Sequence, residues 1–271
     1  MNTLRGIALS PMVAVLLVAG AASIPGCNSS NSGNGGAISS GINGQIAYRS
    51  RRDVNPPSYN DEIFVMNADG SGQTNVSNSL FADRAPSWSP DGTRIVFTSN
   101  RGISSGNIFV MDADGTNVAQ LTTTDTTDRE PSWSPDGTKI VFSSFRDGHY
   151  QIYVMKANGA NQTRLTNNLD DSDGNPSWSP DGTKLAFDSD RDGNAAIFVI
   201  AGDGTSLTKL TNNAANDRAP VWSPDGTKLA FNSDRDGNDE IYVMDADGNG
   251  QTRLTNSPDY DIEASWQSLP N

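Results

Sequence analysis

One acidic residue recurs at a fixed place in this chain, five positions before each of its five tryptophans. Carboxylates at the same place in every repeat of a ring-shaped fold would form a circle of negative charge, which attracts a cation or a basic partner segment. The alternative is a turn residue whose side chain accepts hydrogen bonds from nearby backbone N–H groups. Both interpretations apply to the same five residues, Asp83, Asp128, Asp173, Asp217 and Asp261.

Two acidic stretches, residues 188–193 and 232–237, resemble the first half of a calcium-binding loop. Glu240 follows the second stretch and could supply a further ligand. Calcium takes about six to eight oxygen ligands, and neither stretch has the glutamate that closes an EF-hand loop. Because Asp-Gly also forms tight hairpin turns, calcium is an alternative to plain turns here, and no other cofactor is expected.

Residues for nucleophilic or metal-assisted catalysis are scarce. His149 is the only histidine and Cys27 the only cysteine, so the chain has no Ser-His-Asp set, no Cys-His pair and no multi-histidine metal site. His149 also stands at a turn position where other repeats have Asn194 and Asn238. We therefore expect no catalytic residues and no enzyme. The alternative is a carbohydrate-binding or glycan-cleaving protein that uses two facing carboxylates.

The segment 49–59 differs most from its counterparts. Tyr48 and Ile63 are 15 residues apart, whereas the equivalent step from phenylalanine to isoleucine is 10 in three repeats and 11 in another. Arginine and tyrosine are enriched at binding hot spots, and proline lowers the cost of ordering a loop. The alternative is a loop insertion without a function. The predicted partner-binding residues are Arg49, Arg51, Arg52 and Tyr59.

A repeated unit must position these residues. The text around four of the tryptophans reads PSWSPDGTRIVF or a close variant, with spacings of 45, 45, 44 and 44 residues. A period in the low forties is typical of β-propeller blades. A large apolar side chain at one place in every repeat is expected to pack between blades, with stacking on a glycan as the alternative. The tryptophans are Trp88, Trp133, Trp178, Trp222 and Trp266.

Each repeat has the pattern of four short strands joined by tight turns. The first strand ends at the tryptophan, and Ser-Pro-Asp-Gly-Thr then forms a turn. The second and third strands, such as 139–142 and 152–155, are apolar without alternation, which predicts that both of their faces are covered. A more polar fourth strand, such as 163–166, completes the unit.

The two ends of the repeat region predict the number of blades. The region begins at residues 45–48, which match a second strand, and finishes at residues 264–267, which match a first strand. The last strand is therefore expected to complete the first blade and close the ring. We predict an all-β fold, a five-bladed β-propeller of four-stranded antiparallel blades over residues 45–271.

The repeats resemble the TolB-like propeller family, also called WD40-like or PD40 repeats. The shared pattern runs through PSWSPDG, RDG, IYVM, DG and LT, and the match covers about residues 45–267. TolB itself is a periplasmic protein of the Tol–Pal envelope system, with an α/β domain before a six-bladed propeller. This sequence shows neither that domain nor the sixth blade. The resemblance implies a cell-envelope propeller that binds other proteins.

The first 44 residues predict export and tethering. An apolar stretch over residues 7–22 is typical of a secretory signal peptide, here 1–26. The residues before Cys27 resemble a lipobox, so we expect Cys27 to be acylated; the alternative is an ordinary cleaved signal. The Ser-, Gly- and Asn-rich residues 27–44 form the expected flexible tether.

The charge of the chain limits its partners. A net charge of −13, from 32 acidic and 19 basic residues, argues against nucleic acid. We expect a monomer held to the membrane through a lipid anchor and facing the periplasm or the cell surface. Its expected function is that of a non-catalytic interaction module for one or more envelope proteins.

Overall fold

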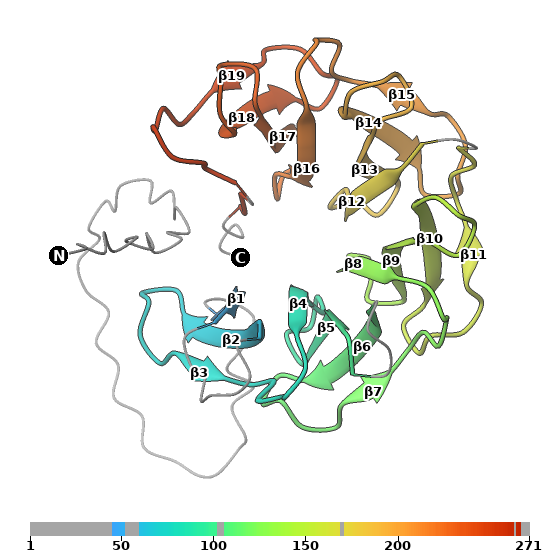
Figure 1. The fold of residues 1–271 in the computed structure, drawn as a ribbon, viewed down its shortest axis with the longest axis vertical. Helices are drawn as coiled ribbons and strands as arrows, with labels where there is room; N and C mark the ends of the chain where they lie inside the picture. Colours follow the sequence, from blue (N-terminus) through green and yellow to red (C-terminus); the bar gives the residue numbers. More distant parts are fainter. Residues whose placement is uncertain (1–44, 52–59, 102–105, 169–170, 263, 267–271) are drawn as a thin grey trace, which may run out of the picture.

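A computed structural model of the protein describes residues 45–51, 60–101, 106–168, 171–262 and 264–266. These residues form β-strands, turns and bends and no helix. The strands are arranged as five blades around a central axis (Figure 1). The predicted all-β, five-bladed propeller is therefore confirmed.

The second to fifth blades share one plan: an inner six-residue strand, two six-residue middle strands and a two-residue outer strand, all antiparallel. Three strands of the first blade are described. The strands are β1 (Gln45–Ser50), β2 (Glu62–Asn67), β3 (Thr74–Asn75), β4 (Asp83–Trp88), β5 (Arg94–Ser99), β6 (Asn107–Asp112), β7 (Ala119–Gln120), β8 (Asp128–Trp133), β9 (Lys139–Ser144), β10 (Gln151–Lys156), β11 (Thr163–Arg164), β12 (Asp173–Trp178), β13 (Lys184–Ser189), β14 (Ala196–Ala201), β15 (Thr208–Lys209), β16 (Asp217–Trp222), β17 (Lys228–Ser233), β18 (Glu240–Asp245) and β19 (Thr252–Arg253).

The Ser-Pro-Asp-Gly-Thr motif builds the turn between the first two strands of a blade. In the third blade the Asp136 carboxylate accepts hydrogen bonds from the Ser134 hydroxyl at 2.6 Å and the Thr138 backbone N–H at 3.0 Å. Gly137 follows with a φ of 69°, a left-handed conformation that favours glycine. The same bonds recur around Asp91, Asp181 and Asp225.

Apolar side chains fill the space between neighbouring blades. Trp133 of β8 packs against Val96 and Val110, which belong to the second blade. Similar clusters join the third blade to the fourth and the fourth to the fifth. Trp133, Trp178 and Trp222 are each more than nine-tenths buried, which agrees with a packing role and leaves little ring surface for a glycan.

The segment expected to close the ring is described only in part. Residues 264–266, expected to begin the inner strand of the first blade, are not assigned to a strand. The chain after β19 turns back toward the centre beside the first blade (Figure 1). There the Trp266 indole N–H donates to the carbonyl oxygen of Val221 in β16 at 3.1 Å. The described part of the closing segment thus contacts the fifth blade, without a ladder to β1.

Several predictions fall on residues outside the described part of the chain. These are the signal peptide 1–26, the acylated Cys27, the tether 27–44, and two of the partner-binding residues, Arg52 and Tyr59. Among the described residues there is no helix with the length and apolar character needed to span a membrane.

Candidate functional site

A buried ion pair recurs in the second to fifth blades. In the fourth blade the Asp173 carboxylate accepts a hydrogen bond from Arg191 Nη2 at 2.8 Å. Arg191 Nε donates to the Ser189 hydroxyl at 2.8 Å, and its guanidinium lies 4.7 Å from the centre of the Phe198 ring. The ion pair therefore joins the inner strand to the turn after β13. The equivalent pairs are Asp83–Arg101, Asp128–Arg146 and Asp217–Arg235.

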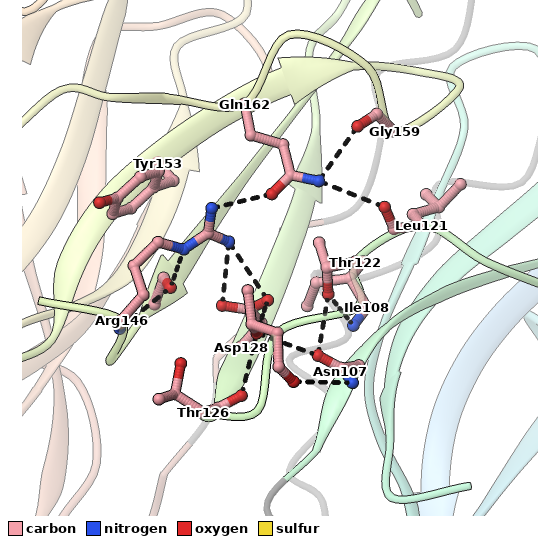
Figure 2. A network of polar contacts seen from close by, with 12 residues as sticks. Asn107, Ile108, Leu121, Thr122, Thr126, Asp128, Arg146, Tyr153, Gly159 and Gln162 are labelled. Atoms are coloured by element: carbon pink, nitrogen blue, oxygen red, sulfur yellow. Dashed lines mark hydrogen bonds and ion pairs between the residues drawn. The ribbon is translucent and has the colours of Figure 1, made fainter. Parts of the chain in front are cut away.

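Figure 2 shows that this unit also connects two blades. Arg146 Nη2 lies 3.3 Å from both oxygens of Asp128, and its Nη1 donates to Gln162 Oε1 at 2.9 Å. The Gln162 amide donates to the carbonyl oxygens of Gly159 at 3.1 Å and Leu121 at 3.3 Å. Since Leu121 follows β7 of the second blade, the ion pair of the third blade is tied to its neighbour.

This placement differs from the expected ring of carboxylates at the channel mouth. Four of the five aspartates are 0–1% exposed, and each is paired with an arginine of its own blade. A buried, ion-paired carboxylate presents no free negative charge to a cation. The fifth, Asp261, is partly exposed, and its backbone N–H donates to the carbonyl of Asp239 at 2.9 Å.

The acidic stretches considered for calcium direct their side chains to separate partners. Asp190 accepts from the Ser172 backbone N–H at 2.6 Å, and Asp192 pairs with Lys209 at 2.7 Å. Glu240 is buried and pairs with Arg253 at 2.7 Å. Over the part of the chain that the structure describes, no three His, Cys, Asp or Glu side chains form a group that could hold a metal ion.

The inner strands surround the centre of the ring (Figure 1), and each carries a bulge close to its start. At the bulge a residue other than glycine has a positive φ, from 49° to 57°, which side chains disfavour. The bulge turns backbone N–H groups toward the preceding blade; that of Glu130 donates to the Thr98 hydroxyl at 3.1 Å. The bulge residues are Ala85, Glu130, Asn175 and Ala219.

Two carboxylates converge beside β12, where the repeat is broken. Gly174 takes the place that is arginine in β4, β8 and β16. A β-carbon on Gly174 would lie 3.2 Å from Asp188 Oδ1 and 3.4 Å from Glu130 Oε2. Gly174 does not have a positive φ, so the backbone conformation does not require glycine here, and the missing side chain leaves room for the two carboxylates.

Asp188 has a strongly altered acidity. Burial raises the pKa of Asp188 to about 6, and the nearby charge of Glu130 adds to the rise. The backbone N–H of Ala219 and the side-chain amide of Asn175, which both donate to Oδ2 at 2.8 Å, oppose it. Oδ1 accepts no hydrogen bond from any described residue. A carboxyl group that titrates near pH 6 beside a second carboxylate can act as an acid–base pair.

Three arginines surround one buried aspartate where the first and second blades meet. Arg51 Nε and Arg84 Nε each lie 2.5 Å from an oxygen of Asp61. Arg49 Nη1 lies 4.0 Å from the same carboxylate. The Asp61 side chain is 2% exposed, whereas those of Arg51 and Arg84 are 66% and 50% exposed. The aspartate thus holds these arginines in place while their charges stay at the surface.

The acidity of Asp61 reflects these contacts. Burial by itself would raise the pKa of Asp61. The hydrogen bonds from Arg51 and Arg84, together with the positive charges of Arg49 and Arg84, outweigh the effect of burial, so the pKa lies below its usual value. The carboxylate is therefore ionised at neutral pH and compensates one of the three guanidinium charges. Of the four residues predicted to bind a partner, the structure brings Arg49 and Arg51 together on Asp61.

The loop between the first and second blades presents two apolar side chains beside these arginines. Leu80 is 79% exposed and Phe81 is 45% exposed. The Asn60 side-chain amide holds the loop by donating to the carbonyl oxygens of Phe81 at 2.6 Å and Ser79 at 2.9 Å. Because Asn60 directly precedes Asp61, the loop and the arginines share one framework.

Other blades build the same loop framework with smaller or polar side chains. Asn194 and Asn238 make the equivalent amide bonds, and the places of the apolar pair are taken by residues 214–215, both alanine, and 258–259, proline and aspartate. Aligning the repeats in the sequence could have revealed this apolar pair. No pattern in the sequence indicates the contact of Asp61 with Arg84. We call the resulting patch the junction surface, which consists of Arg49, Arg51, Leu80, Phe81 and Arg84.

The fold and these sites define a class of protein, a β-propeller with regular blade cores and an irregular first junction. A family model described as "PD40: TolB beta propeller domain" matches residues 104–173 and 167–269, which together make up more than half of the chain. The chain therefore belongs to the TolB beta-propeller family.

Solved structures of TolB proteins agree with this assignment, and a curated peptidase matches a short stretch of the chain. TolB from Acinetobacter baumannii superimposes with a TM-score of 0.69 at 26% identity, over 78% of this chain and 53% of that one. A putative TolB from Agrobacterium tumefaciens gives 0.67 at 27% identity, over 74% and 72%. Dipeptidyl-peptidase 5 of Porphyromonas gingivalis is 40% identical over 52 residues, 19% of this chain and 8% of the enzyme. The chain thus matches about half of the first TolB and a small part of the peptidase.

Proposed function

We propose that this protein is a non-catalytic interaction module of the bacterial cell envelope, which docks a partner protein on the junction surface. The observation that carries the proposal is the break in the repeat between the first two blades. There, two apolar and two arginine side chains are each 45% exposed or more, whereas two other blades place alanine, proline or aspartate where Leu80 and Phe81 stand. Exposed aromatic and arginine side chains are typical of binding hot spots.

Affinity capture after crosslinking in intact cells tests this function. The double variant Leu80→Ser with Phe81→Ser is compared with wild type and with Leu207→Ser, a matched control because Leu207 is also exposed on a loop of the fourth blade. We expect wild type and the control to retain one or a few envelope proteins, and the double variant to lose them. Recovery of nothing above background by wild type would refute the interaction function.

Export and anchoring belong to the same proposal. The N-terminal pattern supports a lipoprotein acylated at Cys27. The similarity to TolB proteins supports export, so that the protein faces the periplasm or the cell surface. Metabolic labelling with palmitate tests the anchor, since label should enter wild type and not a Cys27→Ser variant. Equal labelling of both proteins would rule out acylation at Cys27.

A second candidate function, a carbohydrate-binding or glycan-cleaving propeller, is favoured by the carboxyl pair of Glu130 and Asp188. Asp188 has a pKa of about 6 and lies near the charge of Glu130. Glycosidases use a pair of carboxyl groups, one of which has a raised pKa. Binding to a glycan array that is lost in both Glu130→Gln and Asp188→Asn would support it. An array without any bound glycan would leave the interaction module as the function.

A further inference from the structure

We propose that the segment docking on the junction surface is acidic, with carboxylate side chains on either side of an apolar one; this inference rests on the proposed interaction function. The first argument is charge. Asp61 is the only carboxylate within 4.0 Å of the guanidinium nitrogens of Arg49, Arg51 and Arg84 among the described residues. One negative charge therefore faces three positive ones, on a protein whose net charge is −13.

The second argument is the way in which the guanidinium groups are held. Arg84 uses Nε toward Asp61, and no described residue accepts a hydrogen bond from its two terminal nitrogens. Those nitrogens form a planar fork that matches the two oxygens of a carboxylate. Because Asp61 already fixes the arginine side chain, a second carboxylate binds a group that has lost much of its conformational freedom.

The third argument is the apolar pair. Leu80 and Phe81 lie in the four residues before Arg84, on the loop that Asn60 holds against the Asp61 segment. A partner that offered only carboxylates would leave both apolar side chains in water. An apolar side chain placed between the carboxylates would cover Leu80 and Phe81, and the burial of apolar surface favours binding.

The occupant is a narrow protein segment and not an anionic membrane. A bilayer would meet a broad area of the surface, and the strongly negative protein would repel it there. A single extended segment contacts the junction surface alone. It is therefore attracted by the arginines and does not contact the rest of the protein surface, which is acidic. Long-range repulsion from that remainder also opposes acidic ligands at other places on the ring.

Peptide binding measured by fluorescence anisotropy tests the inference. The probe is a labelled peptide with alternating Asp and Leu or Phe residues, and its control is the same peptide with Asn in place of Asp. We expect only the acidic peptide to bind, with an affinity that falls about tenfold between about 50 and about 300 mM salt. Equal binding of the two peptides, or binding of phosphatidylglycerol vesicles with no binding of the acidic peptide, would overturn the inference.

A matched pair of variants locates the site. Arg84→Gln removes the charge while Asp61 keeps its bond to Arg51, and Arg218→Gln makes the same change at the equivalent position of β16. We expect Arg84→Gln to weaken binding of the acidic peptide about tenfold and Arg218→Gln to leave it unchanged. An equal loss in both variants would contradict the assignment.

The cellular capture experiment separates this inference from the proposed function. A partner captured by wild type and by Arg84→Gln, but lost in the Leu80→Ser, Phe81→Ser variant, would retain the interaction module and reject the acidic segment. A partner that is lost in both variants supports the two proposals together.

Discussion

At the scale of single residues, the buried aspartate–arginine pairs are the repeated polar element of the blades. Removing one partner of a buried pair leaves an uncompensated charge, which costs about 3 to 5 kcal/mol. Asp173 is fully buried, and its Oδ2 already has no hydrogen-bond partner among the described residues. Arg191 therefore contributes to stability, because without it the buried negative charge of Asp173 would have no partner.

We expect Arg191→Ala to lower the free energy of unfolding by about 3 kcal/mol, because it leaves the Asp173 carboxylate buried and unpaired. The control is Lys228→Ala, which removes a pair with Asp245 in which both side chains are about half exposed. Its effect should stay within about 0.5 kcal/mol. Urea denaturation followed by tryptophan fluorescence measures both changes, and equal losses would contradict the account.

Asp188 gives a pH-dependent prediction at the same scale. Its pKa in the folded protein, about 6, lies above the ordinary value of 3.8, so folding favours the protonated form. Its contribution to stability is fully present below about pH 4 and is lost as the pH rises through about 6. The penalty at neutral pH is about 3 kcal/mol for a shift of this size.

Asp188→Asn replaces the carboxylate with a neutral group of the same shape. We expect the variant to be more stable than wild type at about pH 7.5 and to lose this advantage at about pH 4. Thermal melts of both proteins at the two pH values measure the difference. A variant less stable than wild type at the higher pH would show that ionised Asp188 is favourable in the fold.

At the scale of elements, the turns between the third and fourth strands press against the preceding blade. A β-carbon on Gly115 would lie 2.0 Å from the carbonyl oxygen of Val76 in the first blade. Gly148 has nearly the same φ, +88° against +86°, but has nothing within 4 Å. The two glycines therefore share the cost of backbone strain and differ in the contact between blades.

We expect Gly115→Ala to destabilise the protein by at least about 2 kcal/mol more than Gly148→Ala. The strain of placing alanine at a positive φ is common to both variants and cancels in the comparison. Chemical denaturation of the two variants side by side gives the difference. Equal losses of stability in the two variants would mean that the first and second blades can move apart at Gly115 without a loss of stability.

The elements also show what the sequence can predict. The spacing of Trp133 and Trp178 and the motif around Asp136 repeat in the text, so the blades and their tight turns follow from pattern alone. Contacts that form only once the ring is assembled do not repeat. Asp61 meets Arg84 from 23 residues away in another blade, and Asp188 and Glu130 both lie beside Gly174. The spacing of apolar residues in the sequence does not predict such contacts.

At the scale of the whole molecule, the described part of the closing segment contacts the fifth blade. Trp266 is partly buried, and its indole N–H donates to Val221 of the fifth blade. We expect Trp266→Ala to lower stability by about 2 kcal/mol. Tyr260→Ala, in the same segment but at a side chain 74% exposed, should change it by less than about 0.5 kcal/mol. Equal melting temperatures for Trp266→Ala and wild type would show that this contact does not stabilise the ring.

The central claim, that a partner docks on the junction surface, also belongs to the whole molecule. The most direct test is site-specific photo-crosslinking in cells, with a photoreactive phenylalanine analogue in place of Phe81 and, as a control, in place of Leu207. Both positions are about equally exposed, at 45% and 44%. We predict a discrete crosslinked protein from position 81 and none from position 207. The absence of a product at position 81, or the same products from both positions, would contradict the account.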